Sequence, residues 1–223
     1  MAVISGENEK KCRFSFLFPH YFVILHPDMD RFEKTNREFE AAVAECRQLF
    51  AQKLHDYRAS WRILRPRSLT DQLLIKARRV RQLEETGCSL VGEGIRPEFI
   101  GLVNYGIVGL IQLERGYSDS VDIGNDEALE LYDHYATQAL ELMKRKNHDY
   151  DEAWRSMRVS SYTDLILTKL ERVKEMEDLQ QRGQQTKVSE GIDANYMDII
   201  NYAVFGLIKL APSTNLVRRD EAQ

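Results

Sequence analysis

An internal duplication limits the folds that this chain can adopt. Residues 53–84 match residues 146–177 at 15 of 32 positions without a gap, where unrelated segments would match at about two. After four extra residues in the second copy, the triplet Glu-Gly-Ile at 93–95 realigns with the same triplet at 190–192. A duplicated unit buries its apolar face against its neighbour, so we expect the two copies to pack together within one chain.

Each copy has the hydrophobic pattern of three helices. Apolar residues recur every three to four positions, and the alternation typical of strands is absent. The predicted fold class is all-α, with two tandem helical repeats packed as a pseudo-symmetric helical bundle that meets through its third helices. Ser68 and Ser161 are expected to cap the second helices. The predicted first and third helices cover 31–59 and 97–113 in the first repeat, and 126–155 and 193–210 in the second. The predicted second helices follow Ser68 and Ser161 and end near Gly87 and Gly183.

The repeats also divide the chain into segments. The apolar run at 14–25 is interrupted by Pro19 and is too short to span a bilayer, so the segment before Met29 is expected to pack poorly or to be non-native. The polar C-terminal tail is expected to be disordered. The resulting division is an extension at 1–28, repeat 1 at 29–113, a linker at 114–125, repeat 2 at 126–210 and a tail at 211–223.

Composition narrows the classes of partner. The chain has 31 basic and 35 acidic residues and a net charge of -4, which argues against general nucleic-acid binding. Three scattered cysteines form no CxxC pair, so a reducing cytoplasmic location is expected. No membrane association is expected, and a homodimer is one option for assembly.

The end of the predicted first helix of repeat 2 has a cation, a carboxylate and an aromatic ring on one face. Lys146, Asp149 and Tyr150 are spaced at i, i+3 and i+4, and Trp154 follows one turn later. The two aromatic residues are either core residues or rings on which a base stacks.

Two cations are repeated on the second helices. Lys169 and Arg172 are three residues apart, as are Lys76 and Arg79 in repeat 1. Either these cations form surface ion pairs with nearby glutamates, or they bind phosphate, with arginine as a planar fork and lysine as a point charge.

The third helix of repeat 2 adds acidic residues. Glu190 lies at its start, and Asp198, Asn201 and Tyr202 share one face at i, i+3 and i+4. Carboxylates that face lysine and arginine are what a magnesium-bound polyphosphate requires, because oxygen atoms bind the ion while cations offset the remaining phosphate charge.

Three strings in repeat 2 resemble a known family. They are KNHDYDEAW at 146–154, the KxxR of 169–172 and EGIDANYMDIINYA at 190–203. They resemble the nucleotide modification associated domain, a helical family first catalogued as of unknown function, and the likeness extends over both repeats. The spacing of Glu190, Asp198 and the following Asn-Tyr also looks like MazG-like all-helical nucleoside triphosphate pyrophosphohydrolases, which bind magnesium through helix-borne acids and release pyrophosphate.

These resemblances imply roles for individual residues. Glu190 and Asp198 would bind Mg²⁺, with Asp149 as a third ligand. The fold would be a MazG-like bundle. The residues implied or considered as contacts of the phosphates or the base are Lys146, Lys169, Arg172, Asn201, Tyr150 and Trp154.

The two repeats are not expected to function equally. Repeat 1 has Gly101 where repeat 2 has Asp198, and Arg96 where repeat 2 has Asp193. Because repeat 1 thereby loses acid at the expected metal site, we interpret it as the degraded copy.

Three functions compete on this evidence. The leading hypothesis is a magnesium-dependent pyrophosphohydrolase acting on a nucleoside triphosphate, a deoxynucleoside triphosphate or a modified nucleotide. The alternative is a noncatalytic nucleotide-binding module associated with nucleotide modification. A purely structural helical adaptor is the third.

Overall fold

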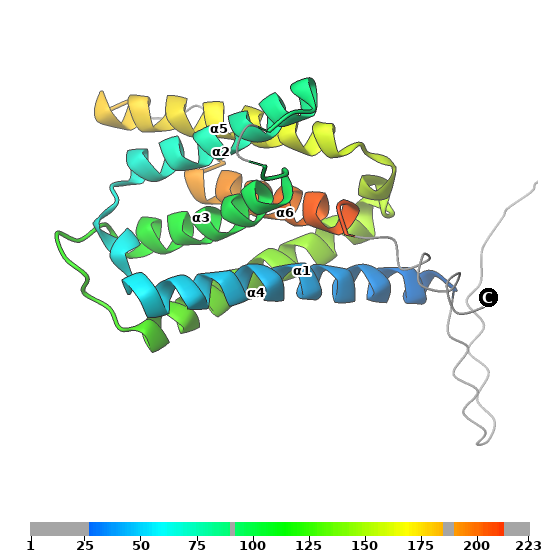
Figure 1. Ribbon diagram of the computed structural model, residues 1–223, viewed down its shortest axis with the longest axis horizontal. Coiled ribbons are helices and arrows are strands. Elements are labelled where there is room, and N and C mark those ends of the chain that lie inside the picture. The colour runs from blue at the N-terminus through cyan, green and yellow to red at the C-terminus, as the bar shows by residue number, and fades with distance from the viewer. Residues whose placement is uncertain (1–26, 90–91, 185–189, 212–223) are drawn as a thin grey trace, which may run out of the picture.

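The structure is a computed structural model that describes residues 27–89, 92–184 and 190–211. Within these ranges it contains six α-helices, two 3₁₀ helices and no strand, so the all-α prediction is confirmed (Figure 1). The helices are α1 (Pro27–Tyr57), η1 (Ser60–Ile63), α2 (Pro66–Thr86) and α3 (Arg96–Arg115) in repeat 1, and α4 (Asn125–Tyr150), η2 (Ala153–Ser156), α5 (Val159–Gln181) and α6 (Ile192–Lys209) in repeat 2.

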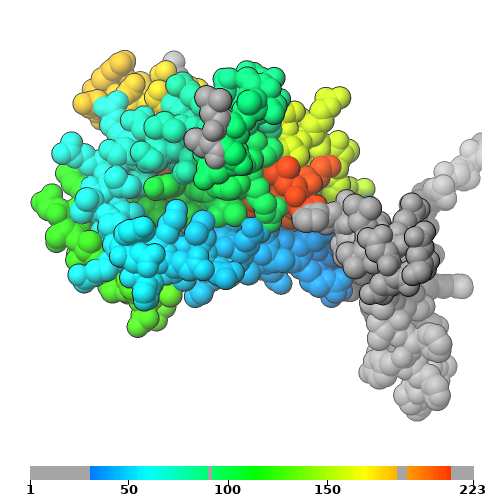
Figure 2. Space-filling model, viewed as in Figure 1, coloured from blue at the N-terminus to red at the C-terminus, as the bar shows by residue number. Residues whose placement is uncertain are grey.

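Each helix packs against its counterpart in the other repeat. Helices α1 and α4 form one side of the bundle, α2 and α5 form the other, and α3 and α6 lie between them (Figure 1). The contact between α3 and α6 is the most extensive in the structure, which confirms the prediction that the repeats meet through their third helices. Side chains of α1, α2 and α3 fill the spaces between the ribbons on one face (Figure 2).

Glycines allow the central helices to approach each other closely. A Cβ on Gly109 would lie 2.9 Å from the Tyr196 ring, and a Cβ on Gly206 would lie 2.8 Å from the Phe99 ring. Gly109 corresponds to Gly206, and Phe99 corresponds to Tyr196, so the same contact occurs twice with the repeats exchanged. Either substitution to alanine would force an aromatic ring out of a packed core.

The ends of the first helices differ from the prediction. Helix α1 ends at Tyr57 and α4 at Tyr150, and each is followed by a turn and a separate 3₁₀ helix. The prediction that these helices reach 59 and 155 was therefore wrong. Left-handed residues cause the break, namely Arg58 in repeat 1 and both Asp151 and Glu152 in repeat 2.

The predicted capping serines were also wrong. Helix α2 begins at Pro66 and α5 at Val159, so Ser68 and Ser161 lie inside the first turn. At the start of α2, proline favours this earlier position because its fixed φ suits a helix and its missing N–H leaves no donor unpaired.

The segment between the repeats is held against repeat 1. Arg62, a buried residue, forms an ion pair with Asp122 at 2.8 Å, and its carbonyl accepts a hydrogen bond of 2.9 Å from the Ser118 amide. Of the predicted extension, residues 1–26 lie outside the described residues, whereas residue 27 already starts α1. Residues 212–223 of the predicted tail also lie outside them. None of the described helices is long and apolar enough to cross a membrane.

Candidate functional site

Charged side chains of repeat 2 gather where α4, α5 and α6 meet. Lys169 Nζ lies 2.7 Å from Asp198 Oδ2, and Lys146 donates to the other oxygen of the same carboxylate. Arg172 forms an ion pair of 2.6 Å with Glu190, which also lies 3.9 Å from Lys169 Nζ. We call these five residues the charge cluster. Its three cations and two carboxylates leave one net positive charge.

A cavity of about 290 Å³ lies beside the charge cluster, and Lys146 and Asp198 belong to both. It is formed mainly by the end of α4, by η2 and by α6, and its walls are mostly apolar and aromatic. Such walls with a few polar groups are typical of small-molecule sites. The lining residues are Met143, Lys146, Asn147, Tyr150, Ala153, Trp154, Met157, Leu165, Asp198, Asn201, Tyr202 and Phe205.

Several polar atoms of the cavity residues are buried without a hydrogen-bond partner. They are both side-chain atoms of the Asn201 amide, the Oδ1 atom of Asn147 and the Nε1 atom of Trp154. Buried polar groups are paired in the great majority of cases, and leaving one unpaired costs about 1–3 kcal/mol. Four such atoms around one cavity are therefore a feature that a bound polar ligand would explain.

The aromatic residues predicted near this site differ in exposure. Trp154 is buried in η2 and stacks on Phe205, with ring centroids 4.3 Å apart, which favours a core role for its ring. Tyr150 is 71% exposed at the edge of the cavity and retains a ring that could stack on a base. Tyr202 is partly buried, so its exposure lies between those of Trp154 and Tyr150. Burial and the nearby Asp198 carboxylate raise the pKa of its hydroxyl above the ordinary value.

Asp149 does not join the other predicted acids. Its side chain is 75% exposed, and its carboxylate lies 3.2 Å from Nδ1 of the adjacent His148. The structure thus brings together Lys146, Lys169, Arg172, Glu190 and Asp198 from the predicted set and leaves Asp149 in solvent. Helical spacing alone places Asp149 and Lys146 on neighbouring positions but does not determine which of them faces α6.

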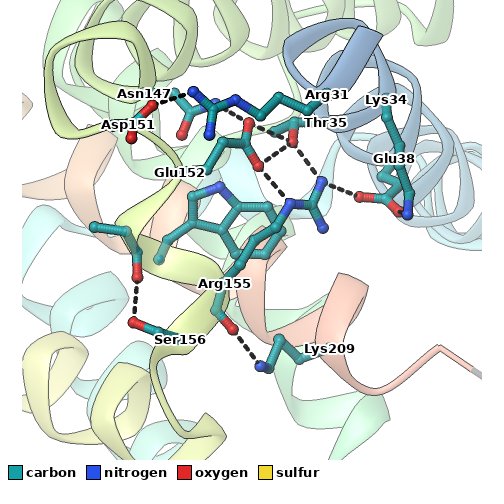
Figure 3. Close-up of polar contacts among 12 residues, drawn as sticks. Arg31, Lys34, Thr35, Glu38, Asn147, Asp151, Glu152, Arg155, Ser156 and Lys209 are labelled. Atoms are coloured by element: carbon teal, nitrogen blue, oxygen red, sulfur yellow. Dashed lines mark hydrogen bonds and ion pairs between the residues drawn. The ribbon is translucent and has the colours of Figure 1, made fainter. Parts of the chain in front are cut away.

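A buried polar network adjoins the cavity through Asn147, and it was not predicted from the sequence. Glu152 accepts hydrogen bonds from Thr35 (2.7 Å) and Asn147 (2.5 Å), and it also pairs with Arg155 (Figure 3). Arg155 in turn reaches Glu38 on α1 at 2.7 Å. The network therefore fixes the turn that follows α4 by tying it to helix α1 of the other repeat.

Charge and backbone geometry show how strongly this turn is constrained. Burial alone would raise the pKa of Glu152, but the hydrogen bonds from Thr35, Asn147 and Arg155 outweigh it and lower the pKa below its ordinary value. Glu152 adopts a left-handed φ of 60°, which costs energy for a residue with a Cβ. The one sequence signal for this network was the repeated Trp-Arg pair, because Arg155 occupies the same position in repeat 2 as Arg62 in repeat 1.

The family model described as nucleotide modification associated domain 1 matches the chain twice, at residues 53–113 and 146–210. The chain belongs to this family. The two matches confirm the predicted tandem arrangement, with one nucleotide modification associated domain in each repeat. No curated protein and no solved structure matches the chain. The resemblance to MazG-like enzymes and to their bundle stays a prediction.

The first nucleotide modification associated domain has a cavity at the equivalent place, with a volume of about 280 Å³. Positions that are 93 residues apart in the first two helices, or 97 apart in the third, correspond between the repeats. By this register almost every residue that lines one cavity has a counterpart that lines the other. The site is therefore a property of the duplicated domain.

The first domain has another acid beside its cations, although Gly101 occupies the position of Asp198, and the interpretation of repeat 1 as the degraded copy stays a prediction. Glu98, one turn earlier on α3, pairs with Lys76 at 3.2 Å and with Arg79, which also binds Glu93. A Cβ on Gly101 would lie 2.8 Å from Lys76, so the lysine side chain covers the space that Asp198 fills in repeat 2. Two cations and two carboxylates are thus paired in repeat 1, and a third cation, Lys53, lines the cavity beside them.

The donor set of the second domain can be compared with what magnesium requires. Among the described residues, no group of three or more His, Cys, Asp or Glu side chains is arranged to bind a metal ion. The two carboxylates at the site, Glu190 and Asp198, both have cations as their partners. In this arrangement the donor set does not fit a bare Mg²⁺, which prefers several uncommitted oxygen atoms. It is better suited to an anionic ligand that can compete for the cations.

Proposed function

We propose that repeat 2 binds a nucleotide, with its phosphates on the cations of the charge cluster and its base in the adjoining cavity. The observation that carries this proposal is the continuity between the two parts through Lys146 and Asp198. A nucleotide combines a polyanion with a flat, polar-edged ring, and the site offers cations beside a largely apolar cavity. Membership of the nucleotide modification associated domain family supports the same conclusion.

Phosphate would replace the carboxylates as partner of the cations. Arg172 is about one-third exposed and offers the planar fork that suits a phosphate, while Lys146, about half exposed, is the more accessible lysine. Asp198 is 7% exposed and holds both lysines in place before a ligand arrives. The phosphates would therefore have to displace the Asp198 carboxylate from both lysines.

Isothermal titration calorimetry tests this proposal. The protein is titrated with the ribo- and deoxyribonucleoside triphosphates and with the monophosphates, each with and without magnesium. We expect saturable binding that is weakened at least tenfold by Arg172→Ala and little changed by the matched Arg79→Ala in repeat 1. Equal loss in both variants would place the ligand at both repeats, and no loss in either variant would place it elsewhere.

A second candidate is hydrolysis of the bound nucleotide by magnesium-dependent release of pyrophosphate. Glu190 and Asp198 lie next to the proposed phosphate positions, and once the phosphates take over their cation partners, these carboxylates would be free to bind the magnesium that accompanies a triphosphate. Magnesium enters this proposal as the counterion that accompanies a triphosphate. Measurement of pyrophosphate in the same titrated samples distinguishes the enzyme from the binding module.

A further inference from the structure

Two equivalent asparagines have opposite hydrogen-bonding states. In repeat 1, Asn104 Oδ1 accepts a hydrogen bond of 2.8 Å from the Tyr132 hydroxyl, and Asn104 Nδ2 donates to the Cys46 carbonyl at 3.1 Å. In repeat 2, the corresponding Asn201 has neither bond, although it is just as buried. Both asparagines line the equivalent cavities.

The hydroxyl group of Tyr132 explains why the amide oxygen is paired in Asn104 and unpaired in Asn201. Tyr132 lies on α4 of repeat 2, and the residue at the same position of α1 is Phe39. Helix α1 packs on α6 as α4 packs on α3, so Phe39 has the place of Tyr132 but cannot donate a hydrogen bond. The repeat that carries the unpaired asparagine is also the one whose Asn147 replaces the apolar Leu54, which adds another unpaired oxygen.

We propose that Asn201 recognises the edge of a nucleobase, and that Tyr132 closes the repeat 1 cavity to the same recognition. This inference rests on the proposed nucleotide binding by repeat 2. A side-chain amide presents one donor and one acceptor side by side, the complement of a base edge on which an acceptor and a donor are adjacent. In repeat 1 the same groups are already occupied by Tyr132 and Cys46.

The remaining walls of the cavity fit a single nucleoside. A volume of about 290 Å³ lies at the lower end for ligand sites, which suits one base and its sugar and not a dinucleotide. Exposed Tyr150 at the edge offers a ring for stacking, which adds affinity without selecting a base. The ligand class is therefore a nucleoside phosphate, in which the base contributes to affinity as well as the phosphates.

The test compares ligands with and without a base. Tripolyphosphate and the nucleoside triphosphates are titrated into the full chain and into Asn201→Leu, which keeps the branched shape of the side chain and has no amide. We expect the variant to bind its best nucleoside triphosphate on the order of tenfold to a hundredfold more weakly, and tripolyphosphate as well as the wild type does. Asn104→Leu is the matched control and should leave both affinities unchanged. Circular dichroism and thermal melting check the fold of each variant.

Phe39→Tyr provides a second, independent variant that keeps the asparagine. The added hydroxyl should occupy Asn201 as Tyr132 occupies Asn104, and should weaken nucleoside triphosphate binding without weakening tripolyphosphate binding. If tripolyphosphate binds the wild type as tightly as the triphosphates do, or if Asn201→Leu and Phe39→Tyr leave the difference intact, base recognition by Asn201 is wrong while phosphate binding stands. If neither ligand binds, the proposed function itself is wrong.

Discussion

Lys169 Nζ lies 2.7 Å from Asp198 Oδ2, and this contact joins α5 to α6 at the centre of the charge cluster. The carboxylate is 7% exposed and the lysine side chain 17% exposed. Removing one partner of a pair this well shielded from water destabilises the folded protein, because the other charge is left buried without a counterion. The same contact blocks the lysine until a stronger anion replaces the carboxylate.

Asp198→Asn should therefore separate stability from binding. We expect a loss of about 1–3 kcal/mol in the free energy of unfolding, together with tighter binding of tripolyphosphate, because the amide no longer competes for the two lysines. Glu98→Gln, the matched change at the buried acid of repeat 1, should lose similar stability and leave tripolyphosphate affinity unchanged. Urea denaturation and calorimetric titration measure the two effects. Unchanged tripolyphosphate affinity in Asp198→Asn would contradict the account of the cluster.

The paired and unpaired asparagines predict opposite effects on stability. Asn104→Leu should lose about 1–3 kcal/mol, because it leaves the buried Tyr132 hydroxyl without an acceptor. Asn201→Leu should be neutral or stabilising, because it removes two buried polar atoms that have no partner. Denaturant unfolding of both variants without ligand decides the matter. Equal losses would mean that Asn201 is satisfied in solution, for example by ordered water.

Replacement of two buried glutamates by glutamine should change the free energy of unfolding in opposite directions. Burial would raise the pKa of Glu152, but its hydrogen bonds lower it, so its charged form contributes stability above the usual glutamate pKa of about 4.3. That contribution is lost as the pH falls through the lower pKa of the folded state. Glu152→Gln should therefore destabilise the protein at pH 7, and the difference from wild type should shrink in acid.

Glu177 is the control for this pH dependence. Burial raises its pKa, and the hydrogen bond from Thr70 offsets this only in part, so its charged form disfavours folding near neutral pH. Glu177→Gln should be neutral or stabilising at pH 7, with the advantage disappearing as the pH falls and wild-type Glu177 becomes protonated. Unfolding curves from pH 3 to about pH 8 compare the variants over this range. A stabilising Glu152→Gln at pH 7 would show that its hydrogen bonds do not compensate for burial.

Helical periodicity and the repeat were enough to predict the fold class and the pairing of the third helices. The same pattern could not predict where α4 ends, because the left-handed residues Glu152 and Asp151 are held by Thr35 and Arg31, which lie on the distant helix α1. Trp154 was therefore expected on a continuous helix but lies in η2 and packs on Phe205. Local sequence carries no signal for a contact that only the packed bundle provides.

The candidate site was predicted in part for the same reason. Charge and spacing selected Lys169, Arg172 and Asp198, which do come together, since α5 and α6 pack on each other and Lys169 contacts both Asp198 and Glu190, the partner of Arg172. The replacement of Asp198 in repeat 1 by Glu98 was missed because it shifts the acid by one turn and breaks the alignment. The difference between Tyr132 and its counterpart Phe39 could not be interpreted from the sequence, because it depends on the packing of α4 on α3.

The two tryptophans of the chain provide the most direct test, because Trp61 lines the repeat 1 cavity and Trp154 lines the repeat 2 cavity. Fluorescence is measured while the tightest-binding nucleoside triphosphate is titrated into wild type, Trp61→Phe and Trp154→Phe. We expect Trp61→Phe to keep the full wild-type change in emission and the wild-type Kd, and Trp154→Phe to lose the change. A change that persists in Trp154→Phe and disappears in Trp61→Phe would place the nucleotide in repeat 1 and show that repeat 2 is not the binding site.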